Sequence, residues 1–155
     1  MTKEERVEKA VALFKEGYNC SQSVVGAYAD LYGFTPEQAF RMSAGFGGGI
    51  GRMRETCGAA CGMFLLAGLE KGATEGKDRA SKNATYAVVQ ELAARFKEEF
   101  GTIKCGELLG LSKKEPIVST SEERTKEYYA KRPCAHMVGK AAEFFGDYLE
   151  KEGKL

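Results

Sequence analysis

The sequence predicts an all-α fold, a compact multi-helix single domain over residues 1–155 with one buried central helix. Three observations favour this fold class. Apolar residues recur at helical spacing along most of the chain, helix-start signals precede these segments, and no segment alternates for long as a half-buried strand would. With 155 residues, 43% of them hydrophobic, the chain has the length of one domain and enough apolar side chains for a core.

Three helices are predicted in the first part of the chain, over about 2–16, 20–32 and 36–44. Each follows a residue whose side chain can accept a hydrogen bond from the backbone of the first turn. These capping residues are Thr2, Asn19 and Thr35. The buried stripe expected on the second helix consists of Val24, Ala27, Tyr28 and Leu31.

The second half of the chain predicts four further helical segments. A long helix is expected over about 77–100, with Gly101 closing it in a left-handed conformation. One or two helical turns begin at Cys105. A highly charged helix with a solvated outer face follows over 122–131, and the last helix covers about 134–150.

The expected central helix lies within 56–72, where no charged side chain occurs between Gly58 and Leu69. A solvent-facing helix would carry a polar stripe, so this one is expected to be enclosed on most sides. Thr56 can cap its start, and Gly72 can close its end in a left-handed conformation. Cys57 then falls in the first turn, where free N–H groups and the helix dipole favour an anionic sulfur.

Four of the five cysteines fall at predicted helix starts. These four are Cys20, Cys57, Cys105 and Cys134. The simplest alternative is that each is a small buried hydrophobe, as free cysteines often are. Helix starts favour thiolates, however, and random burial would scatter the cysteines along apolar faces. We therefore expect the four sulfurs to lie together in one site, with Cys57 as its redox-active member.

A glycine-rich loop, GFGGGIGRMRE over 45–55, directly precedes the expected central helix. It lacks the spacing of a dinucleotide fingerprint and the Gly-Lys-Ser/Thr ending of a P-loop, so a nucleotide site is disfavoured. Its glycines instead allow the backbone to approach a small bound group. We expect this role for Gly47, Gly48 and Gly49.

Two arginines close the same loop, Arg52 and Arg54. One interpretation is that they are solvated surface charges, which suits at least one of them. The other is that they keep Cys57 as a thiolate or offset the charge of an anionic centre.

The residue types allow more than one kind of centre. Structural zinc usually takes its cysteines in close pairs such as Cys-x-x-Cys, and the chain has none. The single His136 is expected to be a partly buried helix residue or a hydrogen-bond donor near the site. An iron–sulfur cluster needs four thiolates, burial and hydrogen bonds to sulfur, all of which helix starts and a glycine-rich loop can supply.

The motifs resemble one known family. The segment Cys57-Gly58-Ala59-x-x-Gly62, with one cysteine upstream and two downstream, is similar to the C_GCAxxG_C_C family, whose members are described as redox-active. The segments NCSQ, GFGGGIGRM and CGELLG fit the same pattern, so the resemblance covers nearly the whole chain. It implies that Cys20, Cys57, Cys105 and Cys134 are the signature positions and that Cys61 is a variable one. A related region in the split-Soret type of cytochrome points to an iron–sulfur centre.

Three functions follow from these observations. The first is a small electron-transfer protein that holds an iron–sulfur cluster on the four signature cysteines. The second is a metal-free thiol–disulfide or redox-sensing protein, in which Cys57, activated by its helix start and by Arg54, attacks and another cysteine resolves. The third is a scaffold stabilised by zinc.

Charge and hydropathy limit the partners. A formal net charge of +1 provides no basic surplus for nucleic-acid binding. The uncharged run is too short to span a membrane, and the N-terminal MTKEERVEKA lacks the apolar core of a secretory signal, so a cytoplasmic protein is expected. The expected partner is a redox protein, either a larger oxidoreductase or a protein at a membrane. No oligomeric state is favoured.

Overall fold

A computed structural model describes all residues 1–155, and it contains α-helices and 3-10 helices but no strand. The all-α prediction is therefore confirmed. The elements in chain order are α1 (Lys3–Lys15), α2 (Cys20–Tyr28), η1 (Ala29–Tyr32), α3 (Pro36–Ser43), η2 (Ala44–Phe46), α4 (Gly58–Lys71), α5 (Arg79–Phe100), α6 (Cys105–Leu108), α7 (Lys126–Lys131) and α8 (Cys134–Lys151).

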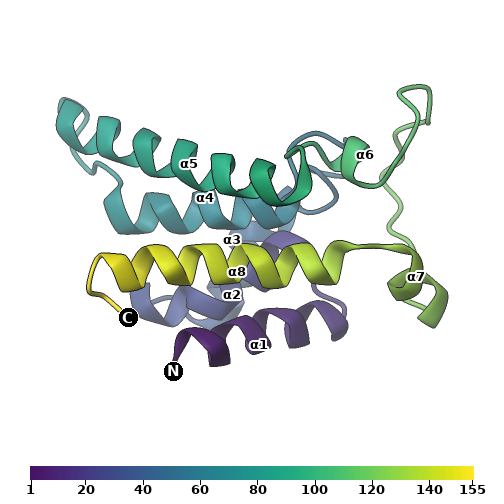
Figure 1. Cartoon of the computed structure of the whole chain (residues 1–155), viewed down its shortest axis with the longest axis horizontal. Helices are drawn as coiled ribbons and strands as arrows, with labels where there is room; N and C mark the ends of the chain where they lie inside the picture. The colour runs from purple at the N-terminus through teal and green to yellow at the C-terminus, as the bar shows by residue number, and fades with distance from the viewer.

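The five longer helices pack side by side around one core of 25 buried residues (Figure 1). Helix α8 runs along the middle of the view and packs against α1, α2, α4 and α5. Helices α6 and α7 lie together at one end of the molecule, joined by a long irregular segment. No helix is both long and apolar enough to cross a bilayer.

Helix α4 is central, as the uncharged run predicts, because it lies against α2, α5 and α8. Its first six residues are all buried, whereas Phe64 and Leu65 are only half-buried. Its ends differ from the prediction. Cys57 is itself the N-cap residue and Thr56 precedes the cap. Gly72 has φ −62° and ψ 140°, which is an extended and not a left-handed conformation.

Helix α2 is as enclosed as α4, and it is shorter than predicted. The α-helix ends at Tyr28, whose φ of −126° breaks the helical geometry, and a 3-10 turn continues to Tyr32. The tighter turn rotates the following side chains, so Leu31 leaves the expected buried stripe and is 42% exposed. The Tyr28 hydroxyl donates to the Ala142 carbonyl of α8 over 2.6 Å, which links the two helices.

The three predicted capping residues are confirmed. Thr2, Asn19 and Thr35 each accept a hydrogen bond from the third helical residue, which reaches back in a full capping box. Gly101 closes α5 with a left-handed φ of 87°. Helix α7 is shorter than predicted, because Thr125 provides its N-cap and 121–124 remains outside it.

A buried arginine joins α1 to the end of α2. The Arg6 side chain is 3% exposed, and its Nη1 donates to the Ala27 carbonyl and to Asp30 Oδ1 over 2.8 and 2.7 Å. Its Nη2 donates to Asp30 Oδ2 over 3.1 Å, which completes a bidentate pair. The pairing offsets the cost of burying a guanidinium in the core.

Candidate functional site

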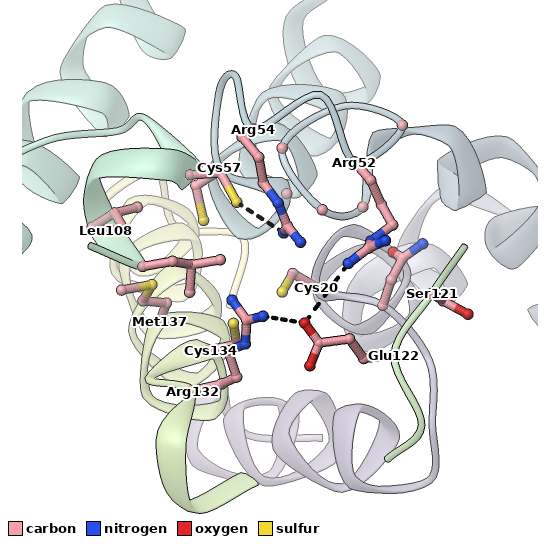
Figure 2. A pocket seen from close by; sticks show the side chains of 18 of the residues that line it. Cys20, Arg52, Arg54, Cys57, Leu108, Ser121, Glu122, Arg132, Cys134 and Met137 are labelled. Atoms are coloured by element: carbon pink, nitrogen blue, oxygen red, sulfur yellow. Dashed lines mark hydrogen bonds and ion pairs between the residues drawn. The ribbon is translucent and has the colours of Figure 1, made fainter. Parts of the chain in front are cut away.

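A cavity of about 300 Å³ opens at the end of the molecule where α6 and α7 lie. Its wall includes all four signature cysteines, Cys20, Cys57, Cys105 and Cys134. Figure 2 shows the labelled cysteines surrounding one common space together with arginine side chains. Segments far apart in the sequence thus bring these four thiols to one place, as the spacing of helix starts predicts.

The helix starts themselves are where the sequence places them. Cys20, Cys105 and Cys134 are the first residues of α2, α6 and α8, and Cys57 is the N-cap of α4. Residues at these positions point toward backbone N–H groups that the helix leaves without intrahelical partners.

Cys57 is held tightly at the base of the cavity. Its backbone N–H donates to the Ile103 carbonyl over 2.6 Å, which joins it to the segment before α6. Burial raises the pKa of its thiol to about 12, although hydrogen bonds from the backbone of Ala60 and Ala59 act in the opposite direction. A neutral thiol is therefore favoured until a positively charged group binds and replaces the lost hydration.

Cys105 lies directly under the glycine-rich loop. Its N–H donates to the Glu55 carbonyl over 2.6 Å, beside a single β-bridge between Thr56 and Lys104. The Arg54 Nη1 lies 3.7 Å from Cys105 Sγ. Burial raises the pKa of the Cys105 thiol, and Arg54 partly offsets this rise. The sequence-based hypothesis that Arg54 acts on Cys57 is thus corrected, because its direct thiol partner is Cys105.

Cys20 and Cys134 are neighbours on the cavity wall, and each thiol shifts the pKa of the other. The contact with Cys134 and burial both raise the pKa of Cys20. The contact with Cys20 lowers the pKa of Cys134, and the positive charges of Arg132 and Arg124 act in the same direction. Cys134 is accordingly the one cysteine of the four for which the surroundings favour the thiolate.

The glycine-rich loop adopts an unusual left-handed course. Gly48, Gly49 and Gly51 have φ of 65°, 73° and 59°. Three residues with side chains share this conformation, namely Ile50, Arg52 and Arg54, with φ of 64°, 61° and 61°. Left-handed backbone costs such residues roughly 1–2 kcal/mol each, and strain of this kind is concentrated at functional sites.

The predicted close approach of this loop to the site is also seen. A Cβ on Gly49 would lie 2.4 Å from the Cβ of Cys105, and one on Gly48 would lie 2.7 Å from the Cγ of Arg52. Gly47 borders the cavity, but a Cβ added to it would lie 2.3 Å from the Cγ of Asn19, whose side chain occupies that space. Gly49 is therefore the glycine of this loop that packs directly against a signature cysteine.

A carboxylate between two arginines closes the outer side of the cavity, and no sequence motif predicts it. Glu122 forms ion pairs with Arg52, over 3.8 Å, and with Arg132 (Figure 2). Arg52 also donates to the carbonyls of Val118 and Thr120. It is therefore no simple solvated charge, since only 18% of its side chain is exposed. We call residues 111–125, which these contacts hold across the cavity, the strap.

Arg124 anchors the end of the strap to the core. Its two terminal nitrogens donate to the carbonyls of Phe14 and Tyr18 over 3.0 and 3.1 Å, and its guanidinium lies 4.4 Å from the centroid of the Phe14 ring. The charged helix predicted over 122–131 is therefore confined to Lys126–Lys131, and the residues before it make tertiary contacts instead. Tertiary contacts of arginines outweigh the local helical signal of a charged segment.

Two residues stand apart from the cavity. Cys61 is buried and does not line it; its thiol donates to the Thr56 carbonyl over 3.7 Å, and burial raises its pKa to about 11. His136 is exposed, contrary to the prediction of partial burial, and its ring meets Phe100 edge-on.

The thiols surround the cavity without converging on one point. No three His, Cys, Asp or Glu side chains are arranged as ligands of a single metal ion. The arrangement can hold an electron-poor group larger than one ion, and it can also join neighbouring thiols as a disulfide. Arg54 and Arg132 add positive charge to either state.

Comparison with known proteins gives one match. No curated protein and no solved structure matches the chain. A family model described as "Putative redox-active protein (C_GCAxxG_C_C)" matches residues 18–148, which include every cysteine of the chain. The chain belongs to this redox-active C_GCAxxG_C_C family.

Proposed function

We propose that the protein transfers electrons by means of an iron–sulfur cluster held on Cys20, Cys57, Cys105 and Cys134. The observation that carries the proposal is the gathering of these four thiols, from four separate segments, around one cavity of about 300 Å³. When bound, such a cluster supplies one-electron redox chemistry at a potential that the surrounding protein adjusts.

The donor set and its surroundings fit this group. Four thiolates are the usual ligands of a cluster, and backbone N–H groups at helix starts provide hydrogen bonds to sulfur. Arg54 at Cys105 and Arg132 near Cys134 supply positive charge, which stabilises the thiolates and the anionic cluster they would form.

A single zinc ion fits less well. Zinc–sulfur bonds of about 2.3 Å would place four sulfurs roughly 3.8 Å from one another around the ion. The thiols instead border a cavity and do not converge as ligands of one ion. The chain also lacks the close cysteine pairs that structural zinc usually takes.

The chain's own residues provide access and burial. Glu122, bound to Arg52 and Arg132, holds the strap across the outer side of the cavity. Cys57 is 5% exposed and Cys105 is 8% exposed, whereas Cys20 and Cys134 are half-buried, so solvent reaches the proposed ligands on the side of Cys20 and Cys134. An electron would pass to a partner protein through this end of the molecule.

The decisive experiment is purification without air, followed by assays of iron and acid-labile sulfide and an absorption spectrum. We expect a brown protein with iron and sulfide in equal amounts. Cys61→Ser is the matched control, because it removes a cysteine that lies outside the cavity and should leave iron and sulfide in place. A colourless protein with neither iron nor sulfide, even after chemical reconstitution, would falsify the proposal.

The shared position of Cys20 and Cys134 on the cavity wall favours a second candidate function, a thiol–disulfide couple (Figure 2). Two thiols would lose two protons and two electrons to an oxidised disulfide substrate, such as glutathione disulfide, and join as one disulfide. Peptide mapping after incubation with glutathione disulfide tests this. A Cys20–Cys134 link formed at the same rate in a Cys61→Ser protein supports it, and five free thiols exclude it.

A further inference from the structure

A second cavity, of about 480 Å³, lies next to the cysteine cavity. Four residues line both cavities and so form the wall between them: Arg52, Arg54, Glu122 and Arg132. No cysteine lines the second cavity. Its volume falls in the range of sites that hold small molecules.

The outer side of the second cavity is apolar and exposed. Met53, Ile117 and Val118 line it and are 47%, 64% and 51% exposed. They are half of the six large hydrophobic side chains that the whole molecule leaves exposed. Apolar side chains gathered at the opening of a cavity are characteristic of binding sites, since exposing them to water is unfavourable.

The wall between the two cavities is positively charged. It contains three guanidinium groups and one carboxylate, Glu122, which is shared by Arg52 and Arg132. Arg54 has no carboxylate partner. Farther from the wall the cavity also carries two lysines and three carboxylates, namely Lys104, Lys113, Glu55, Glu107 and Glu115.

None of these three carboxylates is an ion-pair partner of a wall arginine. Glu107 accepts a hydrogen bond from the Thr102 hydroxyl over 2.6 Å, and Glu55 and Glu115 form no ion pair with any arginine. The backbone that carries the positive wall is also strained. Both Arg52 and Arg54 have left-handed backbone conformations, which place their side chains between the cavities at a cost in strain.

We propose that the second cavity binds a small organic anion with an apolar body. Its negatively charged group would face Arg54 and Arg52, and its apolar body would contact Met53, Ile117 and Val118. Bound there, the molecule would be separated from the Cys105 sulfur by the Arg54 guanidinium alone. The inference goes beyond the proposed function and requires no cluster, because protein side chains alone form the cavity.

The test uses a fluorescent anion of this class, 8-anilino-1-naphthalenesulfonate, titrated into the full-length protein purified without air. We expect saturable binding of one molecule, and at least about tenfold weaker binding of the uncharged N-phenyl-1-naphthylamine. Displacement by hexanoate or by hexyl phosphate then distinguishes a carboxylate ligand from a phosphate ligand. Displacement by either supports the proposal.

Matched variants locate the bound probe. Ile117→Ser with Val118→Ser removes the apolar contact, and Lys113→Gln removes a charge that lines only this cavity. We expect about tenfold weaker binding for the double variant and a smaller loss for Lys113→Gln. The controls are Leu31→Ser, an exposed apolar residue elsewhere, and Arg41→Gln, whose charge is on α3.

Three results would overturn the inference: no saturable binding, equal affinity for the charged and the uncharged probe, or equal losses in the cavity variants and the controls. Iron and sulfide are measured on the same samples. A colourless protein that binds the anion contradicts only the proposed iron–sulfur function. A brown protein that does not bind the anion contradicts only the proposed anion site.

Discussion

Cys57 and Cys61 lie one helical turn apart in the sequence, yet only the first borders the cysteine cavity. We expect Cys57→Ser to abolish or greatly weaken the bound centre, because serine is a poor replacement for a thiolate ligand. Cys61→Ser should retain it, with a loss of about 1 kcal/mol in the free energy of unfolding. Iron content per protein and urea unfolding measure the two effects. Equal loss of colour in both variants would show that the ligand set is wrong.

Gly49 offers a second residue-scale prediction. Alanine there would overlap the Cβ of Cys105 and would keep a left-handed φ of 73°. We expect a destabilisation of about 1–2 kcal/mol, a faster loss of the centre and a shifted reduction potential. Gly45→Ala is the control, since its added Cβ meets no atom within 4 Å and its φ is not positive. Identical chromophore half-lives for the two variants would rule out contact between this loop and the centre.

At the scale of single residues, the sequence predicted that the four cysteines share one site and that the loop glycines lie beside it. It paired Arg54 with Cys57, whereas Arg54 contacts Cys105. Arg54 contacts Cys105 because the backbone of Glu55 binds the start of α6, a tertiary pairing with no local signal. The left-handed conformations of Ile50 and Arg52 could not be predicted either, since residues with side chains rarely adopt them.

Arg6 of α1 forms an ion pair with Asp30, just after α2, in which the arginine is buried and the carboxylate is half exposed, and this gives a pH-dependent prediction. The hydrogen bond and charge of Arg6 lower the pKa of Asp30 below 3.8. A lowered pKa in the folded state stabilises the protein above the unfolded value, and the stabilisation is lost as the pH falls through the folded value. We expect Asp30→Asn to reduce stability near neutral pH and to remove part of this acid sensitivity.

Urea unfolding at several values between about pH 3 and pH 6 tests the Asp30 prediction. Glu37→Gln is the matched control, because its ion pair with Arg41 is on the surface, with both side chains more than 70% exposed. Surface pairs contribute little to stability, so this variant should follow the wild-type curve. A parallel shift of both variants would contradict a special role for Arg6 and Asp30.

The strap is the element that the sequence described least well. Its charged residues suggested a solvated helix, whereas Glu122 and Arg124 make tertiary contacts that hold the segment across the cavity. Helical periodicity carries no information on such contacts, and the real helix is confined to Lys126–Lys131 behind its Thr125 cap. The long amphipathic helices α1 and α8, by contrast, follow their apolar periodicity closely.

Removing the charge of Glu122 should loosen the strap. We expect Glu122→Gln to increase proteolysis at Lys113 and Lys114 and to accelerate loss of the centre in air, because the two arginines lose their shared carboxylate. Timed trypsin digestion and absorption decay provide the measurements. Glu123→Gln is the control, with the same change of charge at a neighbouring residue that forms no ion pair. Equal cleavage rates in the two variants would contradict the conclusion that the ion pairs of Glu122 hold the strap in place.

The overall architecture of the molecule was easier to predict from the sequence than its single contacts. An all-α fold with a central α4 follows from long apolar periodicities and clear caps, which depend on local chemistry. The cavity follows less directly, since four helix starts can converge in many topologies. The sequence could place the thiols at helix starts, but only tertiary packing brings those starts to one end of the molecule.

The gathering of four cysteines from distant segments has a consequence for folding. A group bonded to all four would cross-link the chain at residues 20, 57, 105 and 134, and closing such loops removes conformational entropy from the unfolded ensemble. The strap lies within the last loop, and Arg124 at its end provides its contacts with the core. Loss of the group would therefore free α6, the strap and α7 first, while the bundle of α1, α2, α4 and α8 stays folded. The lifetime of this end of the protein in a cell would then depend on the supply of iron and sulfide.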